Sequence, residues 1–407
     1  MTDENATSAE EEQTKKEVKK GLIESIFRGS NRPKNVRELG ISTLKNLPGT
    51  VGAVQGFMKA VNWKQAQDEV LQGLNNTVVI VGQPNTGKST LFNKIKGQQL
   101  SPVSPEAGTT RTLVRTDFGP FTLIDTPGHL PDVTESGLDQ ASVIVLLIDA
   151  TKGLQAKDRE LYEIVKKLKK PTILAVNKVD TLKGGESGDQ LAAQVAVQFG
   201  VVGVIPISAR TGENIAEELI PAMIEASPEA ALVIGRELPE YRRKAAQRII
   251  RNATLVSLAA GLEPIPLIDI PILLGTQIRL VLRIAALYGE PLNTAAAREH
   301  ARELVVTMIG GLSLRYLAEQ AAKAVPFGGD FVAGAIAGAG TWSIGEVALE
   351  YYESGRRINP RRLRQLYTGF YRRFRKEKTT EEWRRYVLDG KEAPILLEEP
   401  QPEVGGL

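Results

Sequence analysis

Residues 77–89 read TVVIVGQPNTGKS, and this stretch decides the fold. A short apolar run leads into the pattern G-x-x-x-x-G-K-[ST], in which glycines let backbone N–H groups surround phosphate oxygens. We expect Lys88 to bridge the β- and γ-phosphates of a nucleotide and the hydroxyl of Ser89 to bind Mg²⁺. The predicted phosphate-binding residues are Gly82, Asn85, Thr86, Gly87, Lys88, Ser89 and Thr90.

Outward from this loop, short apolar runs alternate with stretches of helical pattern. The runs are 77–81, 121–124, 143–148, 172–176 and 202–207. Such alternation predicts βαβ units, and therefore an α/β domain with a mostly parallel sheet and helices on both faces. We place this domain at 75–228. The uncharged run 190–209 is long enough to suggest a membrane span, but it contains glycines and a proline and is interpreted as a helix plus a strand of this domain.

Two further motifs predict the magnesium site. Asp125-Thr126-Pro127-Gly128 ends the run 121–124, where the aspartate can hold Mg²⁺ through water and the Gly128 N–H can reach the γ-phosphate. Thr109 and Thr110 precede a predicted strand between the phosphate loop and Asp125, which is the place for a threonine that closes over Mg²⁺. The predicted metal ligands are Ser89, Thr110 and Asp125.

The last two motifs predict which base is bound. Asn177-Lys178-Val179-Asp180 ends the run 172–176, and Asp180 can accept hydrogen bonds from N1–H and the 2-amino group of guanine. Adenine lacks both donors, so a buried carboxylate there discriminates strongly against it. Ser208-Ala209-Arg210 ends the run 202–207, where a backbone N–H can reach the guanine O6. Five ordered motifs at strand ends predict a domain that binds GTP and GDP.

These motifs, GQPNTGKS, GTTR, DTPG, NKVD and SAR, make residues 75–228 resemble the P-loop G domain of the translation-class GTPases Era, Der and MnmE. The resemblance implies GTP hydrolysis and a K⁺ ion bound by Asn85. His129 departs from that group and resembles the water-positioning histidine of elongation factors. The residues expected to take part in catalysis are Asn85, Lys88, Thr110, Gly128 and His129.

The segments before the domain, and the composition of the chain, add little about chemistry. Residues 1–30 read as a charged disordered tail without the pattern of a secretory signal, and 31–74 as amphipathic helices. The 407 residues carry 51 basic and 48 acidic side chains, a net charge of +3, so an electrostatic partner must be bound by a local patch. The absence of cysteine excludes disulfides and thiolate metal sites.

Residues 229–355 are predicted to form an all-α hydrophobic domain. They resemble a bacterial domain of unknown function found in YcjF-like membrane-associated proteins, on the pattern PIPLIDIPILL, on 286–289 and on the glycine-rich 328–345. Gly334, Gly338 and Gly345 would permit close helix packing. Basic residues on both sides of the apolar stretches suit anionic lipid. A domain lying in or on the membrane and a soluble helical bundle both remain open. The first basic cluster is Arg242, Arg243, Lys244, Arg248 and Arg251.

The tail 356–407 begins strongly basic and ends acidic and proline-rich. Between Arg356 and Arg385 there are twelve basic and three acidic residues with aromatics interleaved. This composition suits RNA, where aromatics stack on bases, or anionic lipid, or packing on its own domain.

Together these patterns predict a GTP-hydrolysing switch at the cytoplasmic face of the inner membrane. The alternatives are a ribosome- or RNA-associated assembly GTPase that uses the basic tail, and a dynamin-like membrane scaffold that forms a nucleotide-dependent dimer.

Overall fold

The computed structural model describes residues 63–75, 77–95, 97, 114–118, 121–125, 138, 141–182, 187–261, 269–292, 294, 296, 299, 304 and 329–376. The chain divides into two compact units. We call Gln67–Ile249 with Arg283–Thr294 the sheet unit. The helical unit comprises Met1–Ala66, Ile250–Leu282 and Ala295–Leu407. The predicted tail 1–30, most of the predicted helices in 31–74, and Thr110, Gly128 and His129 lie outside the described residues.

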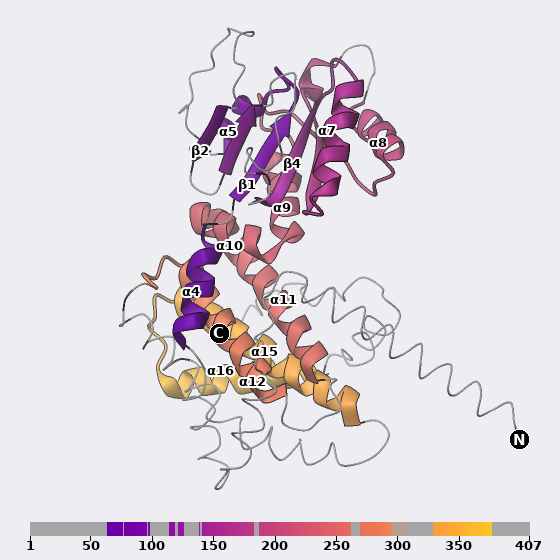
Figure 1. Cartoon of the computed structure of the whole chain (residues 1–407). Helices are drawn as coiled ribbons and strands as arrows, with labels where there is room; N and C mark the ends of the chain where they lie inside the picture. The colour runs from indigo at the N-terminus through magenta and orange to yellow at the C-terminus, as the bar shows by residue number, and fades with distance from the viewer. Residues whose placement is uncertain are drawn as a thin grey trace, which may run out of the picture. The chain divides into compact units, whose positions relative to one another are not determined.

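The sheet unit contains a six-stranded sheet (Figure 1). Its strands are β1 Thr77–Gly82, β2 Val114–Phe118, β3 Phe121–Asp125, β4 Ala141–Asp149, β5 Thr172–Asn177 and β6 Ile205–Ile207. The order across the sheet is β2-β3-β1-β4-β5-β6. β2 is antiparallel to β3, and all other neighbouring pairs are parallel. The predicted α/β class with a mostly parallel sheet is confirmed.

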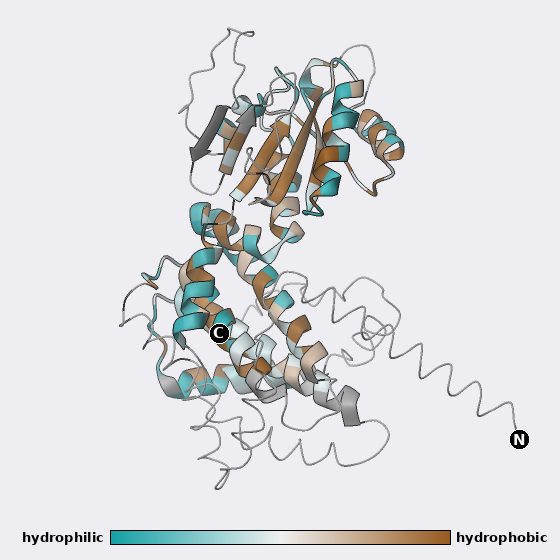
Figure 2. Ribbon diagram, in the orientation of Figure 1, coloured by the Kyte–Doolittle hydropathy of each residue, from teal (hydrophilic) through white to brown (hydrophobic). Residues whose placement is uncertain are grey.

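Buried side chains on both faces of the sheet explain why its central strands are apolar throughout. All nine residues of β4 are buried, and β1 and β4 are coloured as hydrophobic in Figure 2. Val79 packs in a cluster with Leu161 and Val165 of α7. Val78 and Ile80 alternate to the opposite face, and both are fully buried. Parallel strands covered on both sides read as continuous hydrophobic runs.

The chain up to residue 241 contains further elements besides the six strands. They are α4 Trp63–Gly73, α5 Lys88–Ile95, α7 Ala156–Lys167, the short helix Val179–Thr181, α8 Gly188–Phe199, the π-helical turn Ile215–Leu219, α9 Ile220–Ala226, α10 Pro228–Glu237 and the turn Pro239–Tyr241. The uncharged run 190–209 is α8 followed by β6, as predicted. The sixth strand is shorter than predicted, because it pairs with β5 only from Ile205 onward and Val202 is fully exposed.

Long helices form the rest of the described chain. They are α11 Arg242–Gly261, α12 Asp269–Leu287, α15 Gly329–Glu353 and α16 Pro360–Lys376. In the helical unit α15 packs tightly on α11 through glycine. A Cβ atom on Gly338 would lie 2.6 Å from Leu258 Cγ, and one on Gly345 would lie 2.7 Å from Ile250 Cγ1. Among the described helices, none is both long and apolar enough to cross a membrane.

The core of the helical unit also contains a small polar cluster. Thr341 of α15 donates to Ser257 of α11 at 2.7 Å, and Gln277 of α12 donates to Thr341 at 3.2 Å. All three side chains are buried. Because buried polar groups must be hydrogen-bonded, this cluster favours one register among the three helices.

Candidate functional site

The phosphate loop joins β1 to α5, as its motif predicts. Lys88, the first residue of α5, is buried, and its Nζ donates to the carbonyls of Gly82 and Gln83 at 2.9 Å each. Thr86 Oγ1 also donates to the Gln83 carbonyl, at 2.9 Å. These bonds hold the loop in a curve around the start of α5, where backbone N–H groups are free of helical partners and favour phosphate.

Gly87 is required by two features of its position. Its φ is +93°, in the left-handed region, and a Cβ there would lie 2.2 Å from Asn177 Nδ2. Any side chain would therefore strain the backbone and push Asn177 away. Asn85, two residues earlier, also has a positive φ of 67°, and its side chain is exposed.

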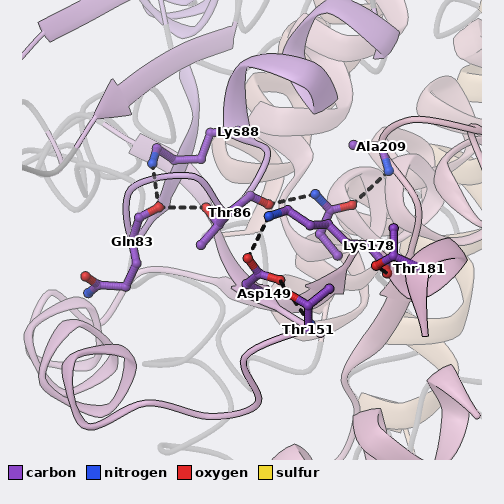
Figure 3. A network of polar contacts seen from close by, with 9 residues as sticks. Gln83, Thr86, Lys88, Asp149, Thr151, Lys178, Thr181 and Ala209 are labelled. Atoms are coloured by element: carbon purple, nitrogen blue, oxygen red, sulfur yellow. Dashed lines mark hydrogen bonds and ion pairs between the residues drawn. The ribbon is translucent and has the colours of Figure 1, made fainter. Parts of the chain in front are cut away.

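Asn177 ties three loops together across the carboxyl edge of the sheet. Its Nδ2 donates to the Thr86 carbonyl at 2.7 Å, and its Oδ1 accepts the backbone N–H of Ala209 at 2.8 Å. The side-chain amide of Asn177 is buried, and both its nitrogen and its oxygen form hydrogen bonds. Figure 3 shows Thr86, Lys178 and Ala209 converging at this point. The phosphate loop and the two predicted base-binding loops are thus joined by one side chain.

Lys178 forms an ion pair that the sequence analysis missed. Its Nζ lies 2.6 Å from Asp149 Oδ2, at the end of β4 (Figure 3). Asp149 Oδ1 accepts the N–H and hydroxyl of Thr151 at 3.0 and 2.7 Å. Burial raises the pKa of Asp149, but the bonds from Lys178 and Thr151 outweigh it and leave that pKa below its usual value. A carboxylate at the carboxyl end of an apolar run was the signal available for this residue.

Asp180 is held by the loop that follows β6. Ser208 Oγ donates to its Oδ1 at 2.6 Å, and Arg210 Nε donates to its Oδ2 at 2.7 Å. The hydrogen bond from Ser208 lowers the pKa of Asp180, burial opposes this, and Arg210 lowers that pKa further. Asp180 is therefore an ionised acceptor at neutral pH. Arg210 is the second residue whose role the sequence analysis missed.

Three further predicted residues lie on α5 and at the end of β3. Ser89 and Thr90 lie in the first turn of α5 and are half-buried. Asp125 ends β3, and the register pairs Ile80 of β1 with Leu123, so Asp125 reaches the same sheet edge as Gly82. The structure thus brings the phosphate-loop residues together with Asn177, Lys178, Asp180, Ser208 and Ala209.

A loop with the phosphate-binding motif, tied to the predicted base-binding loops at one edge of a mostly parallel sheet, is typical of nucleotide-binding domains of the P-loop class. Residues 77–178 match a family described as "50S ribosome-binding GTPase", and residues 233–376 match a domain of unknown function, DUF697. GTPase Era of Aquifex aeolicus strain VF5 is 30% identical over 217 residues, covering 46% of this chain and 72% of Era. The chain belongs to the Era-like GTPases and carries a DUF697 domain after its GTPase domain.

Other relatives share the GTPase domain over a smaller part of their length. GTPase Der of Alkaliphilus oremlandii strain OhILAs is 35% identical over 167 residues, and the match covers 37% of each chain. The Era chain in a crystal structure of Era in complex with MgGDPNP and nucleotides 1506–1542 of 16S ribosomal RNA is 30% identical in sequence to this chain. The match covers 44% of this chain and 67% of Era, with a TM-score of 0.32.

Proposed function

We propose that this protein binds GTP and hydrolyses it to GDP and phosphate, acting as a nucleotide switch. The observation that carries the proposal is the Asn177 tie, which holds the phosphate loop and the Ala209 loop at 2.7 and 2.8 Å. A ligand spanning the site would place phosphates at Lys88 and guanine at Asp180. Membership of the Era-like GTPases supports the same reaction.

The residues that would hold Mg²⁺ are Ser89, Thr110 and Asp125. Hydroxyl and carboxylate oxygens are the hard donors that Mg²⁺ prefers, and Ser89 directly follows the phosphate-binding Lys88 on α5, so this donor set fits the ion. When bound, Mg²⁺ neutralises charge on the β- and γ-phosphate oxygens.

The chain's own groups supply the remaining steps. Lys88 stabilises charge on the phosphates, and the Gly128 N–H meets the γ-phosphate. His129 orients the attacking water, so His129→Ala should slow turnover while leaving GTP affinity nearly unchanged. Asn85 would hold K⁺, which would supply positive charge to the transition state. Release of the γ-phosphate then frees the segments that contain Thr110 and Gly128.

Hydrolysis tests this proposal directly. Lys88→Ala should lower single-turnover GTP hydrolysis by roughly a hundred- to a thousandfold, as is typical when one preorganised charge-stabilising group is removed. Lys167→Ala is a matched control, because Lys167 is an exposed lysine at the end of α7. Hydrolysis that is unchanged in Lys88→Ala would contradict the proposed role of the phosphate loop.

We further propose that α16 docks the protein on anionic lipid at the cytoplasmic face of the inner membrane. Residues 354–376 contain nine basic residues and no acidic ones. Arg361, Arg364 and Arg372 are exposed, whereas Leu363 is buried. Charge complementarity supports contact with lipid headgroups, which attract basic segments by about 1 kcal/mol per residue.

The aromatic residues of α16 support lipid over RNA. Tyr367 and Tyr371 are buried, and Phe370 packs edge-on against Trp342 of α15 with ring centroids 5.8 Å apart. Rings packed in this way do not stack on bases, which is how single-stranded RNA is usually recognised. Two arginines at the start of α11 make contacts within the protein. Arg248 pairs with Glu225 at 3.6 Å, and Arg242 lies 5.0 Å from the Tyr288 ring. Arg242 and Arg248 are thus less available to lipid than the exposed arginines of α16, so the proposal rests on α16.

Binding to ribosomal RNA is the second candidate, favoured by the description of the matching family and by the RNA in the Era complex. Replacing Arg361, Arg364 and Arg372 with Gln should weaken binding to anionic vesicles about a hundredfold, and salt should do the same. A control variant with Lys157, Lys167 and Arg236 replaced by Gln removes three exposed charges from the sheet unit. RNA binding without vesicle binding would contradict the membrane proposal and support the ribosomal one.

A further inference from the structure

Arg210 stands in a rigid turn that aims it at the base-reading carboxylate. Gly212 N donates to the Ser208 carbonyl at 2.8 Å, and Thr211 N donates to Ser208 Oγ at 3.1 Å. Within this fixed turn the Arg210 side chain is 73% exposed, yet it reaches Asp180, whose side chain is 9% exposed. An exposed arginine gains little from such a pair, so its placement calls for a reason other than stability.

The two oxygens of Asp180 have different partners. Oδ1 accepts one hydrogen bond, from Ser208 Oγ at 2.6 Å. Oδ2 accepts one hydrogen bond, from Nε of Arg210 at 2.7 Å, and Nη2 of the same side chain lies 2.5 Å from it as an ion-pair contact. A carboxylate oxygen offers about two lone-pair sites. Both close contacts of the Arg210 guanidinium thus fall on Oδ2, whereas the contact to Oδ1 comes from Ser208.

The guanidinium of Arg210 and the edge of guanine present the same chemistry. In guanine, N1–H and the 2-amino group sit on one carbon and point in parallel, as Nε–H and Nη2–H do in arginine. A carboxylate receives such a donor pair with one bond on each oxygen. Guanine therefore needs one acceptor site on Oδ2 as well as one on Oδ1, and both close contacts of Arg210 already fall on Oδ2.

We propose that Arg210 is an internal competitor of the guanine base for Asp180, and that it lowers both guanine-nucleotide affinity and selectivity for the 2-amino group. This inference rests on the proposed binding of GTP. A guanine must displace at least one donor of Arg210. Hypoxanthine lacks the 2-amino group, so it can bond Oδ1 through N1–H and leave Arg210 in place. The competition thus acts on GDP more than on IDP.

The test compares GDP and IDP binding in the full-length protein and in Arg210→Ala. Because exposed ion pairs are weak, GDP should bind roughly two- to fivefold more tightly to the variant and dissociate more slowly by a similar factor. IDP affinity should change less, so the GDP-to-IDP selectivity should rise. Arg236→Ala is the matched control, since Arg236 is an exposed arginine on α10 of the same unit.

Weaker or unchanged GDP binding in Arg210→Ala would overturn the proposal, because it would mean that Arg210 positions Asp180 or has no effect on it. An equal gain for GDP and IDP would also overturn it, since the competition would not involve the 2-amino group. If neither the natural protein nor the variant binds GDP, the proposed function itself fails. The two failures are therefore distinguishable.

Discussion

The sheet unit and the helical unit differ in what they bury. In the sheet unit, charged groups such as Lys88, Asp149 and Asp158 lie inside, and Lys88 and Asp149 sit where loops leave the carboxyl ends of strands. In the described part of the helical unit, the buried polar side chains are neutral: Thr254, Ser257, Gln277, Thr341 and Ser343. Charged groups held in place by loops can bind and polarise a ligand, whereas neutral groups between helices fix packing.

On α16 of the helical unit, charge lies on the surface. α16 keeps Tyr367 and Tyr371 inside and exposes Arg361, Arg364 and Arg372. We therefore expect changes in the sheet unit to alter chemistry and changes in the helical unit to alter stability or docking. Each prediction below tests that division, beginning with the largest expected effect.

The largest effect should come from Asp180→Asn. The change replaces an acceptor with a donor facing the 2-amino group of guanine, so preference should move from GTP to xanthosine triphosphate by as much as about four orders of magnitude. Competition binding with the two nucleotides measures this shift. The stability of the helical unit should not change, and an Asp180→Asn variant that keeps its preference for GTP would refute the role of Asp180.

Potassium should have the next largest effect. If Asn85 holds K⁺, exchanging Na⁺ for K⁺ should raise turnover at saturating GTP by about ten- to a hundredfold, because a fixed positive charge stabilises the transition state. Asn85→Ala should remove this response without changing GDP affinity greatly. Equal rates in the two salts would eliminate the ion site.

The architecture of the sheet unit was predictable because two independent patterns agree on it. Apolar runs locate strands, and the phosphate motif fixes what must follow β1. The predicted start of the sixth strand was wrong by three residues, since Val202 looks like a strand residue but is fully exposed. Pairing partners, which periodicity does not report, decide where a strand begins.

The candidate site was predictable residue by residue but not pair by pair. The motifs located Asn177, Asp180 and Lys88, yet they did not reveal that Asn177 contacts Thr86, 91 residues earlier in the sequence. The ion pairs of Asp149 and Arg210 were not predicted because the fold alone brings their partners near. Thr110, Gly128 and His129 stay predictions.

Two glycine substitutions in the helical unit should have opposite effects on stability. Gly345→Ala would place a methyl group 2.7 Å from Ile250 Cγ1 and 2.9 Å from its Cγ2, and Ile250 is buried, so we expect a loss of about 1–2 kcal/mol. Gly369 on α16 has open space around it, so Gly369→Ala should gain about 0.5–1 kcal/mol from helix propensity.

Urea unfolding followed by tryptophan fluorescence measures both glycine changes. The two tryptophans that the structure describes, Trp63 and Trp342, belong to the helical unit. Their signal therefore reports that unit, while binding of a fluorescent GDP reports the sheet unit. Altered GDP affinity in Gly345→Ala would show that the division between chemistry and packing does not hold.

The smallest effect should come from Asp158, a buried carboxylate in the first turn of α7. Its Oδ2 accepts the N–H of Gln155 at 2.9 Å, while its buried Oδ1 has no hydrogen-bond partner among the described residues. Burial raises the pKa of Asp158, the Gln155 bond opposes this, and the charge of Asp149 raises that pKa further. Asp158 is therefore a charged group that the sheet unit buries without using it in the proposed chemistry.

The sign of its pH dependence follows from that raised pKa. The folded state holds the proton more tightly than the unfolded state, so ionised Asp158 destabilises the fold at pH 7. This destabilisation is lost as the pH falls through the raised pKa of the folded state towards the pKa of Asp158 in the unfolded state. Asp158→Asn keeps an acceptor for Gln155 and removes the charge. The substitution should therefore change the free energy of unfolding in a more stabilising direction at pH 7 than below pH 4, by at most about 1 kcal/mol.

Urea unfolding of both proteins at the two pH values measures this difference. Loss of bound fluorescent GDP reports the sheet unit. Asp189→Asn is the control, since Asp189 is an exposed carboxylate in the first turn of α8. If Asp158→Asn is instead less favourable at pH 7 than in acid, then the ionised carboxylate stabilises the fold. Neighbouring groups would then stabilise the charge of Asp158, as hydrogen bonds do for Lys88 and Asp149.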